Sequence, residues 1–496
     1  MLLKLIFFIF FAISYVIRAL LWLTRLQQKE YRRDRLWSYL VTPDGIKELL
    51  KIFPRKKDLT RIGLVRPKFT LRMMVISLFL QILVLVLLIK FYPLSLLGQI
   101  TFYLLVIFLV PFLSLLANLP AAVIFEWQVA QKTKQAQAKI AQGKPKIIGI
   151  TGSYGKTSTK IILQHVLQQK YSVYATPKSF NTRYSLTRDI ADHYQGQEIA
   201  IIEYAAYKPG EIQAVAQKIT PDWAVITGFT QQHLALFKSI DNIIQAKAEL
   251  IRALNSDGLV FYNAQDEGVK QIIALAHAHT NELTDEQFIA CSGSNSLIKL
   301  TAPKLNSQGK LSFIFYNQEI QTKLVGYRYL TIIQTVMTIA TQLKLSSKQI
   351  ITGLQTFQPP IFFVNFFQHQ DQFWVLDDGR TTNQVAFMDV MALTQTISTK
   401  KKLTGKKYLL TSGIVDLGSQ SDSIHLELAK QAKTVFTNVI YNGNVGQEQF
   451  HAVFGDQLIT NTHTITTILA SLSDQDLLVI EGFIPLWLQN YLIVKN

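Results

Sequence analysis

Cysteine is almost absent from this chain of 496 residues, because Cys291 is its single cysteine. One thiol excludes both an intramolecular disulfide framework and a cysteine-rich zinc module. Acidic residues are also scarce beside basic ones, with 33 Asp and Glu against 50 Lys and Arg, so the formal net charge is +17. No internal repeat or low-complexity tract is evident. The length is enough for two or three domains with full hydrophobic cores.

A positive net charge can indicate nucleic acid, but the basic residues here do not alternate with aromatic residues that could stack on bases. They gather instead at residues 25–72 and 132–146, next to long apolar stretches. Anionic lipid head groups are therefore a more economical partner than nucleic acid. We expect membrane lipids, and no nucleic acid, among the partners.

Long hydrophobic runs are abundant in the first quarter of the chain. Residues 2–23, 73–90 and 97–125 each have the length and apolar composition of a membrane-spanning helix. A signal peptide is the alternative for the first run, but it is followed by basic residues and by no small-residue cleavage site. We therefore predict a retained anchor, within a membrane region over residues 1–130 that has about three transmembrane helices.

The basic residues also predict how these helices are oriented. A basic loop at residues 25–72 and the basic segment after residue 125 both belong on the cytoplasmic side under the positive-inside rule, which leaves the N-terminus outside. We expect a multi-pass protein of the inner (cytoplasmic) membrane. Its catalytic domains then lie in the cytoplasm, where ATP is.

A phosphate-binding signature begins the part that follows. Residues 146–160 read KIIGITGSYGKTSTK, which joins a β-branched run, a glycine-containing turn and the start of a helical pattern. Such a turn presents backbone N–H groups and a helix N-terminus to phosphate, while Lys156 reaches the outer phosphates and Thr157 can hold Mg²⁺. The turn lacks the first glycine of the strict P-loop, so a chance turn is the alternative. The strand and helix around it favour a nucleotide site.

From residue 143 onward, apolar strand patterns alternate with helical patterns. Strands are expected at residues 147–150, 172–175, 199–203, 223–227 and 259–262, and a second such pattern begins beyond residues 358–360. The alternation predicts an α/β fold with a doubly wound, mainly parallel P-loop domain over residues 143–357. A smaller Rossmann-like α/β domain is expected over residues 360–496.

Three polar residues downstream of the P-loop are candidates for the same site. Glu203 ends one predicted strand, His233 follows another, and Lys247 lies on a predicted helix. The carboxyl ends of the strands in a doubly wound sheet meet at one edge, so we expect these side chains near the P-loop. Taken singly, each also has an ordinary structural explanation, such as a core histidine or a solvated helical lysine.

Together these segments resemble the Mur ligase family, and most closely its MurF branch, which adds D-alanyl-D-alanine to the muramoyl tripeptide. The matching text is TGSYGKTSTK, SFNT, EYAAYKPGEI, PDWAVITGFTQQHL and AKAEL, in that order between residues 151 and 250. The ordered set is far more specific than a P-loop alone. The resemblance covers roughly residues 145–450.

The resemblance implies an ATP-dependent acid–amino-acid (C–N) ligase that forms ADP and phosphate through an acyl phosphate. Its implied catalytic residues are Lys156, His233 and Lys247, with Lys247 carbamylated. Two Mg²⁺ ions are implied, one bound by Thr157 and Glu203 and the other by His233 with support from Lys247. The implied nucleotide contacts are Gly152, Ser153, Gly155, Lys156, Thr157, Ser158, Asn181, Asn263, Asp266, Asp378 and Arg380.

The chain departs from the family at three places. The small domain that binds the uridine nucleotide in relatives has no equivalent here, and GYRYLTI near Gly326 replaces the family's G-x-H-N-x-x-N. The segment PPIFFVNFF lacks the family's arginine, for which Arg328 or Arg380 are candidate substitutes.

These departures leave the substrates open. The acceptor is expected to be a UDP-linked or lipid-linked muropeptide, and the donor an amino acid or a dipeptide. Relatives that amidate lipid-linked glutamate usually carry a four-cysteine zinc ribbon, which a single cysteine excludes. The alternative function is a degenerate, membrane-anchored ATP-binding sensor or scaffold of wall precursors without ligase activity.

Overall fold

The chain divides into two compact units, Met1–Lys132 and Thr133–Asn496. The computed structural model describes residues 2–55, 58, 65–91, 94–177, 180–231, 234–279, 283–370, 372–379, 383–415, 417, 420–483 and 485–492. Two of the predicted site residues, His233 and Arg380, lie outside the described residues.

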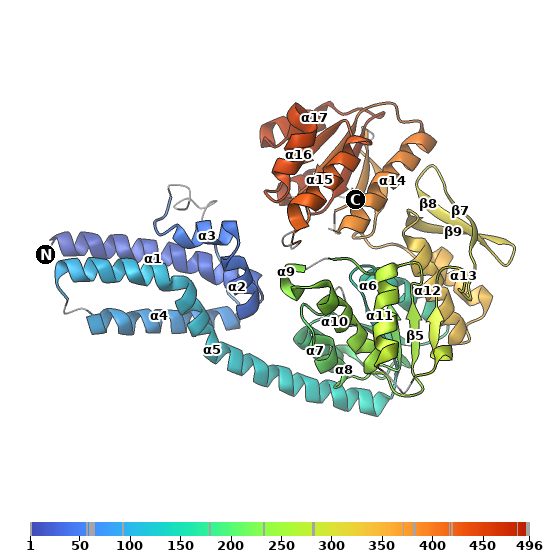
Figure 1. The fold of residues 1–496 in the computed structure, drawn as a ribbon, viewed down its shortest axis with the longest axis horizontal. Helices are drawn as coiled ribbons and strands as arrows, with labels where there is room; N and C mark the ends of the chain where they lie inside the picture. Colours follow the sequence, from blue (N-terminus) through green and yellow to red (C-terminus); the bar gives the residue numbers. More distant parts are fainter. Residues whose placement is uncertain are drawn as a thin grey trace. The chain divides into compact units, whose positions relative to one another are not determined.

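Long apolar helices dominate the first unit. In the described part of the chain, three helices are long and apolar enough to cross a membrane: α1 (Leu2–Gln28), α4 (Leu71–Phe91) and α5 (Leu96–Gly143). They coincide with the three predicted runs, although α5 continues well beyond residue 125 (Figure 1). Large apolar side chains on their surfaces face outward, such as Leu97 at 75% exposure and Val123 at 72%.

The segment predicted as a basic loop contains two short helices, α2 (Arg33–Leu40) and α3 (Pro43–Leu50). Helix α3 begins with Pro at its first position after Thr42, whose side chain accepts a hydrogen bond from the N–H of Gly45. This combination is a strong local start signal for a helix.

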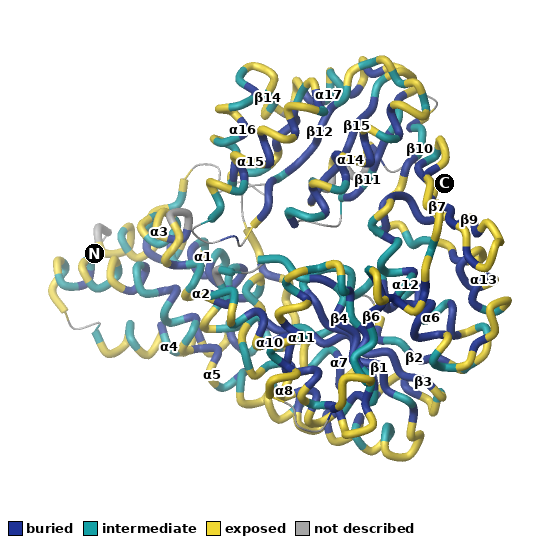
Figure 2. Tube along the Cα trace, turned by 45° about the vertical axis from the view of Figure 1, so that its right-hand side comes forward, coloured by how far each residue is buried: buried dark blue, intermediate teal, exposed yellow. Residues whose placement is uncertain are grey.

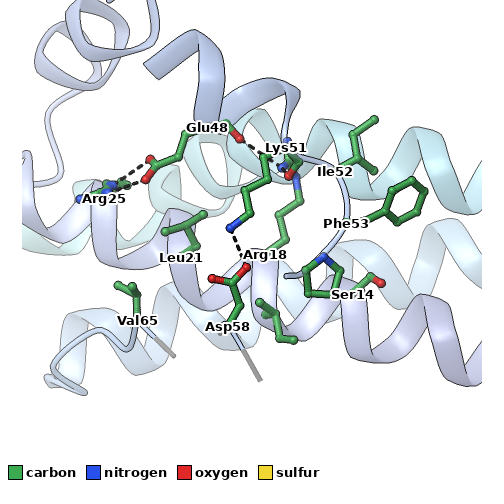
Figure 3. A pocket seen from close by; sticks show the side chains of 12 residues that line it. Ser14, Arg18, Leu21, Arg25, Glu48, Lys51, Ile52, Phe53, Asp58 and Val65 are labelled. Atoms are coloured by element: carbon green, nitrogen blue, oxygen red, sulfur yellow. Dashed lines mark hydrogen bonds and ion pairs between the residues drawn. The ribbon is translucent and has the colours of Figure 1, made fainter. Parts of the chain in front are cut away.

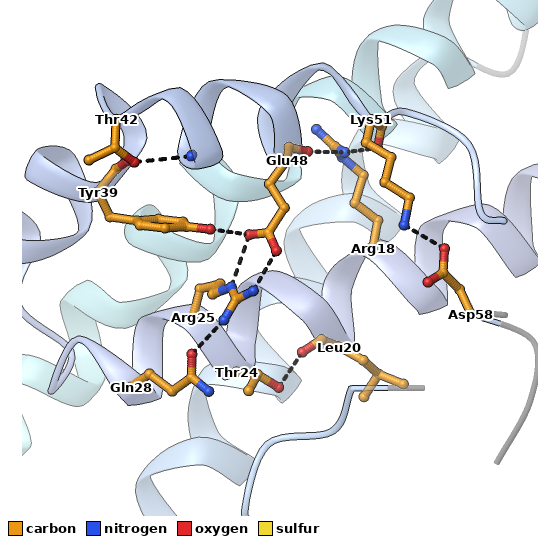
Figure 4. A network of polar contacts seen from close by, with 11 residues as sticks. Arg18, Leu20, Thr24, Arg25, Gln28, Tyr39, Thr42, Glu48, Lys51 and Asp58 are labelled. Carbon is orange, nitrogen blue, oxygen red and sulfur yellow. Dashed lines mark hydrogen bonds and ion pairs between the residues drawn. The ribbon is translucent and has the colours of Figure 1, made fainter. Parts of the chain in front are cut away.

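Paired charges attach this segment to α1. The buried guanidinium of Arg18 donates to the carbonyl oxygens of Leu49 and Lys51 and, on α5, of Ile107. Arg25 makes a two-pronged ion pair with Glu48 (Figure 4). Lys51 forms an ion pair with Asp58 at 2.6 Å. Both residues, together with apolar side chains, line a pocket (Figure 3). Pairing is what makes charges tolerable in apolar surroundings.

The second unit begins with a six-stranded parallel sheet in the order β2-β3-β1-β4-β5-β6. Its strands are β1 (Lys146–Thr151), β2 (Val173–Ala175), β3 (Ile199–Glu203), β4 (Trp223–Ile226), β5 (Leu259–Tyr262) and β6 (Phe288–Ala290). Successive residues of β3 pack on opposite faces, with Ile201 in one apolar cluster and Ala200 and Ile202 in the other. Such two-sided burial is typical of a doubly wound sheet.

Helices cover both faces of this sheet (Figure 1). One face packs against α6 (Lys156–Leu167), α12 (Tyr329–Gln342) and α13 (Ser347–Thr356). The other face packs against α7 (Arg183–His193), α8 (Glu211–Ala216), α10 (Ile240–Arg252) and α11 (Glu267–Ala278). A short helix, α9 (Leu234–Phe237), precedes α10. A separate three-stranded antiparallel sheet comprises β7 (Thr301–Leu305), β8 (Lys310–Phe315) and β9 (Gln318–Val325).

A second six-stranded sheet follows, in the order β10-β11-β15-β12-β13-β14. Its strands are β10 (Asn365–His369), β11 (Phe373–Asp378), β12 (Lys407–Thr411), β13 (Asn438–Tyr441), β14 (Leu458–Ile459) and β15 (Leu477–Glu481). Only the edge strand β10 is antiparallel to its neighbour in this described sheet. The accompanying helices are α14 (Gln384–Lys401), α15 (Ser421–Lys433), α16 (Gln447–Phe454), α17 (Thr462–Ser471) and α18 (Leu486–Leu492).

The central strands of both sheets are buried, as Figure 2 shows for β1, β4, β12 and β15. The predicted fold class is therefore confirmed: a doubly wound parallel sheet, a second α/β sheet and long apolar helices before them. The prediction did not include the antiparallel edge strand or the three-stranded sheet.

Candidate functional site

The glycine-containing turn between β1 and α6 has the backbone shape of a phosphate-binding loop. Gly152 and Gly155 have φ angles of +151° and +79°, and α6 begins directly after Gly155. A Cβ on Gly152 would lie 2.2 Å from Thr227 Oγ1, so only glycine fits there. The turn therefore brings backbone N–H groups and the α6 N-terminus to the carboxyl edge of the sheet, where phosphate binds in such folds.

The segment after β4 holds this loop in place. The N–H of Ser153 donates to the carbonyl oxygen of Gly228 at 2.7 Å, and the Thr227 hydroxyl lies within hydrogen-bond distance of the carbonyl oxygens of Thr151 and Tyr154. Lys156 Nζ donates to the loop carbonyl of Gly152 at 2.8 Å. The predicted loop residues are thus assembled as one rigid turn, with Ser158 in the first turn of α6.

Glu203, the last residue of β3, is the centre of the polar cluster below the loop. Its side chain is 1% exposed. Oε2 accepts from the Thr157 hydroxyl at 2.9 Å and from Lys160 Nζ at 3.1 Å, and Oε1 accepts from Asn181 Nδ2 at 3.2 Å. The structure therefore brings together Thr157, Glu203 and Asn181, which were predicted from the sequence, and adds Lys160.

The electrostatics of the cluster favour an ionised carboxylate. Burial by itself raises the pKa of Glu203, but the charges of Lys156 and Lys160 outweigh burial and lower that pKa below its usual value. Burial also lowers the pKa of both lysines. The cluster is thus an anion surrounded by cations in a low-dielectric position.

Lys247 on α10 is buried at 4% exposure. Burial, and next to it the charge of Lys156, lower its pKa to about 7, against opposing effects of Glu203, Glu249 and Glu211. A substantial fraction of this amine is therefore neutral and nucleophilic near pH 7. The charges of Lys156 and Glu203 both act on Lys247, so the three groups lie within electrostatic range of one another.

Two residues predicted as nucleotide contacts, Asp266 and Asn263, have hydrogen-bond partners within the chain. Asp266 caps α11 by accepting from the N–H of Val269, and its other oxygen accepts from the Tyr154 hydroxyl at 2.9 Å and the N–H of Phe229 at 2.8 Å. Asn263 Oδ1 accepts from the Ser292 hydroxyl. Asp266 therefore ties the P-loop to α11 through Tyr154, a contact that was not predicted from the sequence.

Asp378, at the end of β11, forms an ion pair with Arg328 at 2.7 Å. Arg328 also donates to the carbonyl oxygen of Ala386. Burial lowers the pKa of Arg328, but the neighbouring carboxylates, first of them Asp378, raise it overall. The Asp378 carboxylate is thus engaged by an arginine that links α12 to the second sheet.

Sequence reasoning missed a second buried glutamate. Glu481 ends β15 beside Asp378 of β11 and Thr411 of β12 in the sheet register. It is fully buried, and its Oε2 accepts from the Thr411 hydroxyl at 2.9 Å. Burial, and the charge of Asp378, raise its pKa well above the usual value. The signal was available, since Glu481 ends an apolar run as Glu203 does.

The oxygen donors of Thr157 and Glu203 fit Mg²⁺, which prefers hard oxygen ligands. Within the described ranges, no group of three or more His, Cys, Asp or Glu side chains is arranged to hold a metal ion. Mg²⁺ takes one or two protein carboxylates and completes its shell with phosphate oxygens and water. The residues present therefore fit one Mg²⁺ beside a bound nucleotide.

Known proteins match the part of the chain that contains the Glu203 cluster. Residues 150–331 match the Mur ligase middle domain. The chain is 33% identical over 142 residues to the UDP-N-acetylmuramoyl-tripeptide–D-alanyl-D-alanine ligase of Rickettsia prowazekii, covering 29% of this chain and 32% of that protein. It is 26% identical over 307 residues to the ligase of the same name from Mycobacterium bovis, covering 61% of this chain and 59% of that protein. The chain thus spans about a third of the first of these relatives.

Solved structures show the same fold. MurF from Acinetobacter baumannii superposes with a TM-score of 0.62 at 19% identity, covering 72% of this chain and 77% of that one. MurF from Thermotoga maritima, determined in complex with ADP, gives a TM-score of 0.60 at 22% identity, covering 72% of this chain and 80% of that one. The chain therefore contains a segment that matches the Mur ligase middle domain and shares the fold of MurF, with long apolar helices ahead of the shared fold.

Proposed function

We propose that this chain is an ATP-dependent amide ligase of peptidoglycan precursor synthesis. It activates a carboxylate as an acyl phosphate and joins it to an amino acid or to D-alanyl-D-alanine. The observation that carries the proposal is Glu203, held between Thr157, Lys160 and Asn181 directly below a phosphate-binding loop. The ADP complex of the Thermotoga maritima relative supports nucleotide binding at the equivalent fold.

The first step forms the acyl phosphate. An oxygen of the substrate carboxylate attacks the γ-phosphorus of ATP, a new P–O bond forms, and the bond to the β–γ bridging oxygen breaks to release ADP. Both reacting oxygens are anionic, so Lys156 and the loop N–H groups must offset their charge. Thr157 and Glu203 would hold Mg²⁺, which would supply further charge neutralisation at the phosphate oxygens.

The second step forms the amide. The nitrogen of the incoming amine attacks the acyl carbon, the C–O bond to phosphate breaks, and the nitrogen loses a proton. No side chain of the protein forms a covalent bond to substrate in either step. The residues of this chain act by binding, orienting and neutralising charge.

Lys247 is proposed to be carbamylated. Its neutral amine adds to CO₂, so that an N–C bond forms, one proton leaves the nitrogen, and a cation becomes a carboxylate. The pKa of about 7 supports this, because the neutral form that reacts is populated at neutral pH. The new carboxylate would support a second Mg²⁺ together with His233. Carbon-13 NMR of protein equilibrated with labelled CO₂ tests this step without any turnover, and the absence of a carbamate signal would contradict it.

The N-terminal helices are proposed to anchor the ligase in the cytoplasmic membrane, with the catalytic domains in the cytoplasm. Their outward-facing leucine, isoleucine and valine side chains support this placement. Because they stand where relatives carry a uridine-binding domain, the acceptor is proposed to be a lipid-linked muropeptide at the inner leaflet. Tighter binding of the soluble UDP-linked precursor than of the undecaprenyl-linked one would contradict this.

Phosphate release tests the proposed activity. The detergent-solubilised full chain is incubated with ATP, Mg²⁺ and pairs of a muropeptide acceptor and an amine donor. We expect phosphate release that requires both members of one pair. ATP binding without partner-dependent phosphate release would instead favour a sensor or scaffold.

A further inference from the structure

Lys160 is a buried lysine that the proposed reaction leaves without a role. It lies on α6, one turn after Lys156, and its side chain is 1% exposed. Its Nζ lies 3.1 Å from Glu203 Oε2 and 3.4 Å from the Thr176 hydroxyl. It therefore connects α6 to two neighbouring strand ends, those of β3 and β2.

Burying the charged side chain of Lys160 costs too much free energy for a residue that only fills space. Desolvating an ammonium and a carboxylate together is expensive, and apolar residues of similar volume are often at least as stable. The positions around Lys160 on α6, such as Ile162 and Leu163, are filled by apolar side chains. A charged residue at this point is better explained by what it does to Glu203.

The groups around Glu203 differ in whether they also have a proposed role in binding the nucleotide or the metal. Thr157 donates to Oε2 but also offers the hydroxyl oxygen that fits Mg²⁺. Lys156 begins α6 beside the loop and is proposed to bind the phosphates. Lys160 is enclosed, so its contact with Glu203 does not compete with the nucleotide. Outer partners of this kind orient a metal-binding carboxylate, and their removal typically costs 10–100-fold in metal affinity.

We propose that Lys160 is a positioning residue that holds the Glu203 carboxylate in one orientation toward the divalent cation. The inference rests on the proposed function, because it assigns Glu203 to the metal. Asn181 holds the opposite oxygen, so the carboxylate is fixed from two sides.

The test is a titration of the detergent-solubilised full chain with Mn²⁺ in the presence of a non-hydrolysable ATP analogue, followed by electron paramagnetic resonance. Lys160→Met is expected to weaken Mn²⁺ binding by about tenfold. Binding of the analogue without metal should change by less than about twofold. Lys160→Arg should recover most of the metal affinity. The matched control is Lys170→Met, which removes an exposed lysine just beyond the same helix.

The outcomes separate the two proposals. If the unaltered chain does not bind Mn²⁺ with the analogue, the proposed function fails. If it binds, and Lys160→Met binds the metal equally well or more tightly, the positioning role is wrong. Should Lys160→Met fail to fold, Thr176→Val keeps both charges but removes the other partner of Lys160. We then expect about threefold weaker Mn²⁺ binding, of the order of one weak hydrogen bond, and unchanged binding would overturn the inference.

Discussion

Each six-stranded sheet has a buried glutamate at the end of an inner strand, and the two glutamates are in opposite electrostatic situations. Glu203 at the end of β3 receives hydrogen bonds from three side chains, one of them a lysine. Glu481 at the end of β15 receives one, from Thr411, and its Oε1 has no hydrogen-bond partner in the described structure. Their pKa values are correspondingly shifted in opposite directions, by nearby lysines for Glu203 and by burial for Glu481.

The comparison shows that burial alone does not decide the charge state of a strand-end carboxylate. The residues before each glutamate are similar apolar runs, AII before Glu203 and LVI before Glu481. What differs is the cationic surroundings that the adjoining turn and helix supply. A carboxylate kept ionised suits a cation, whereas a carboxyl group with a raised pKa suits a neutral hydrogen-bonding role.

The largest expected contrast is in activity. Glu203→Gln should lower partner-dependent phosphate release by about 10³-fold, because it removes charge that binds the metal. Glu481→Gln should change the rate by less than about tenfold, since the amide resembles a protonated carboxyl group. Initial rates at saturating ATP and Mg²⁺ measure both variants. Equal losses of activity in the two variants would contradict the proposed difference between Glu203 and Glu481.

Lys247→Ala should lower the rate by about 100-fold, because the carbamate is proposed to support a metal. Added short-chain carboxylates should restore part of the activity by standing in for the missing group. Rates with and without acetate measure this effect, with Lys170→Ala as the control. A rate that is unchanged without acetate would rule out this metal site.

Stability should depend on pH in opposite ways at the two glutamates. The lowered pKa of Glu203 stabilises the fold above about pH 4.3, the value for an unfolded chain, and this stabilisation is lost as pH falls through the folded value. The raised pKa of Glu481 makes stability fall as pH rises from about 4.3 toward its folded value.

Urea unfolding as a function of pH tests these signs. Glu203→Gln should cost about 3 kcal/mol near pH 7, because it leaves Lys160 buried without its counter-charge. Glu481→Gln should cost less than about 1 kcal/mol and should remove the loss of stability with rising pH. A steeper loss in that variant would contradict the assignment.

Elements predicted well from the sequence are those whose signals are local. The run from β1 through the glycine turn to α6 carries its own glycines, β-branched strand and helical pattern. Glu203 and Lys247 were predicted from ordered motifs. Both are buried in the structure, and their roles stay predictions.

Other features depend on contacts between distant residues, which a single sequence does not contain. Asp266 was predicted as a nucleotide contact from the family resemblance, and only the fold shows that Tyr154 and Phe229 donate hydrogen bonds to its carboxylate. In the sequence Lys160 resembles a surface lysine, but in the fold it is buried beside the ends of β2 and β3. By contrast, the pairing of β10 with the adjacent strand β11 and the Thr42 cap of α3 are local, so these two features could have been predicted.

The smallest expected effect concerns the tie between the P-loop and α11. Tyr154→Phe removes the hydroxyl that donates to Asp266 and should cost about 1 kcal/mol of stability. ATP affinity should fall by less than about tenfold, because Thr227 and Gly228 still hold the loop. Thermal unfolding and a fluorescent-nucleotide titration measure both, and a loss of all nucleotide binding would show that the tyrosine does more than brace the loop.

The most direct test of the central claim is the stoichiometry of products. ADP and the amide are quantified by mass spectrometry after incubating the solubilised chain with ATP, Mg²⁺, a muropeptide acceptor and D-alanyl-D-alanine, beside the Glu203→Gln variant. The account predicts equal amounts of ADP and amide from the unaltered chain and almost none from the variant. ADP formed without amide, or equal product from both proteins, would contradict it.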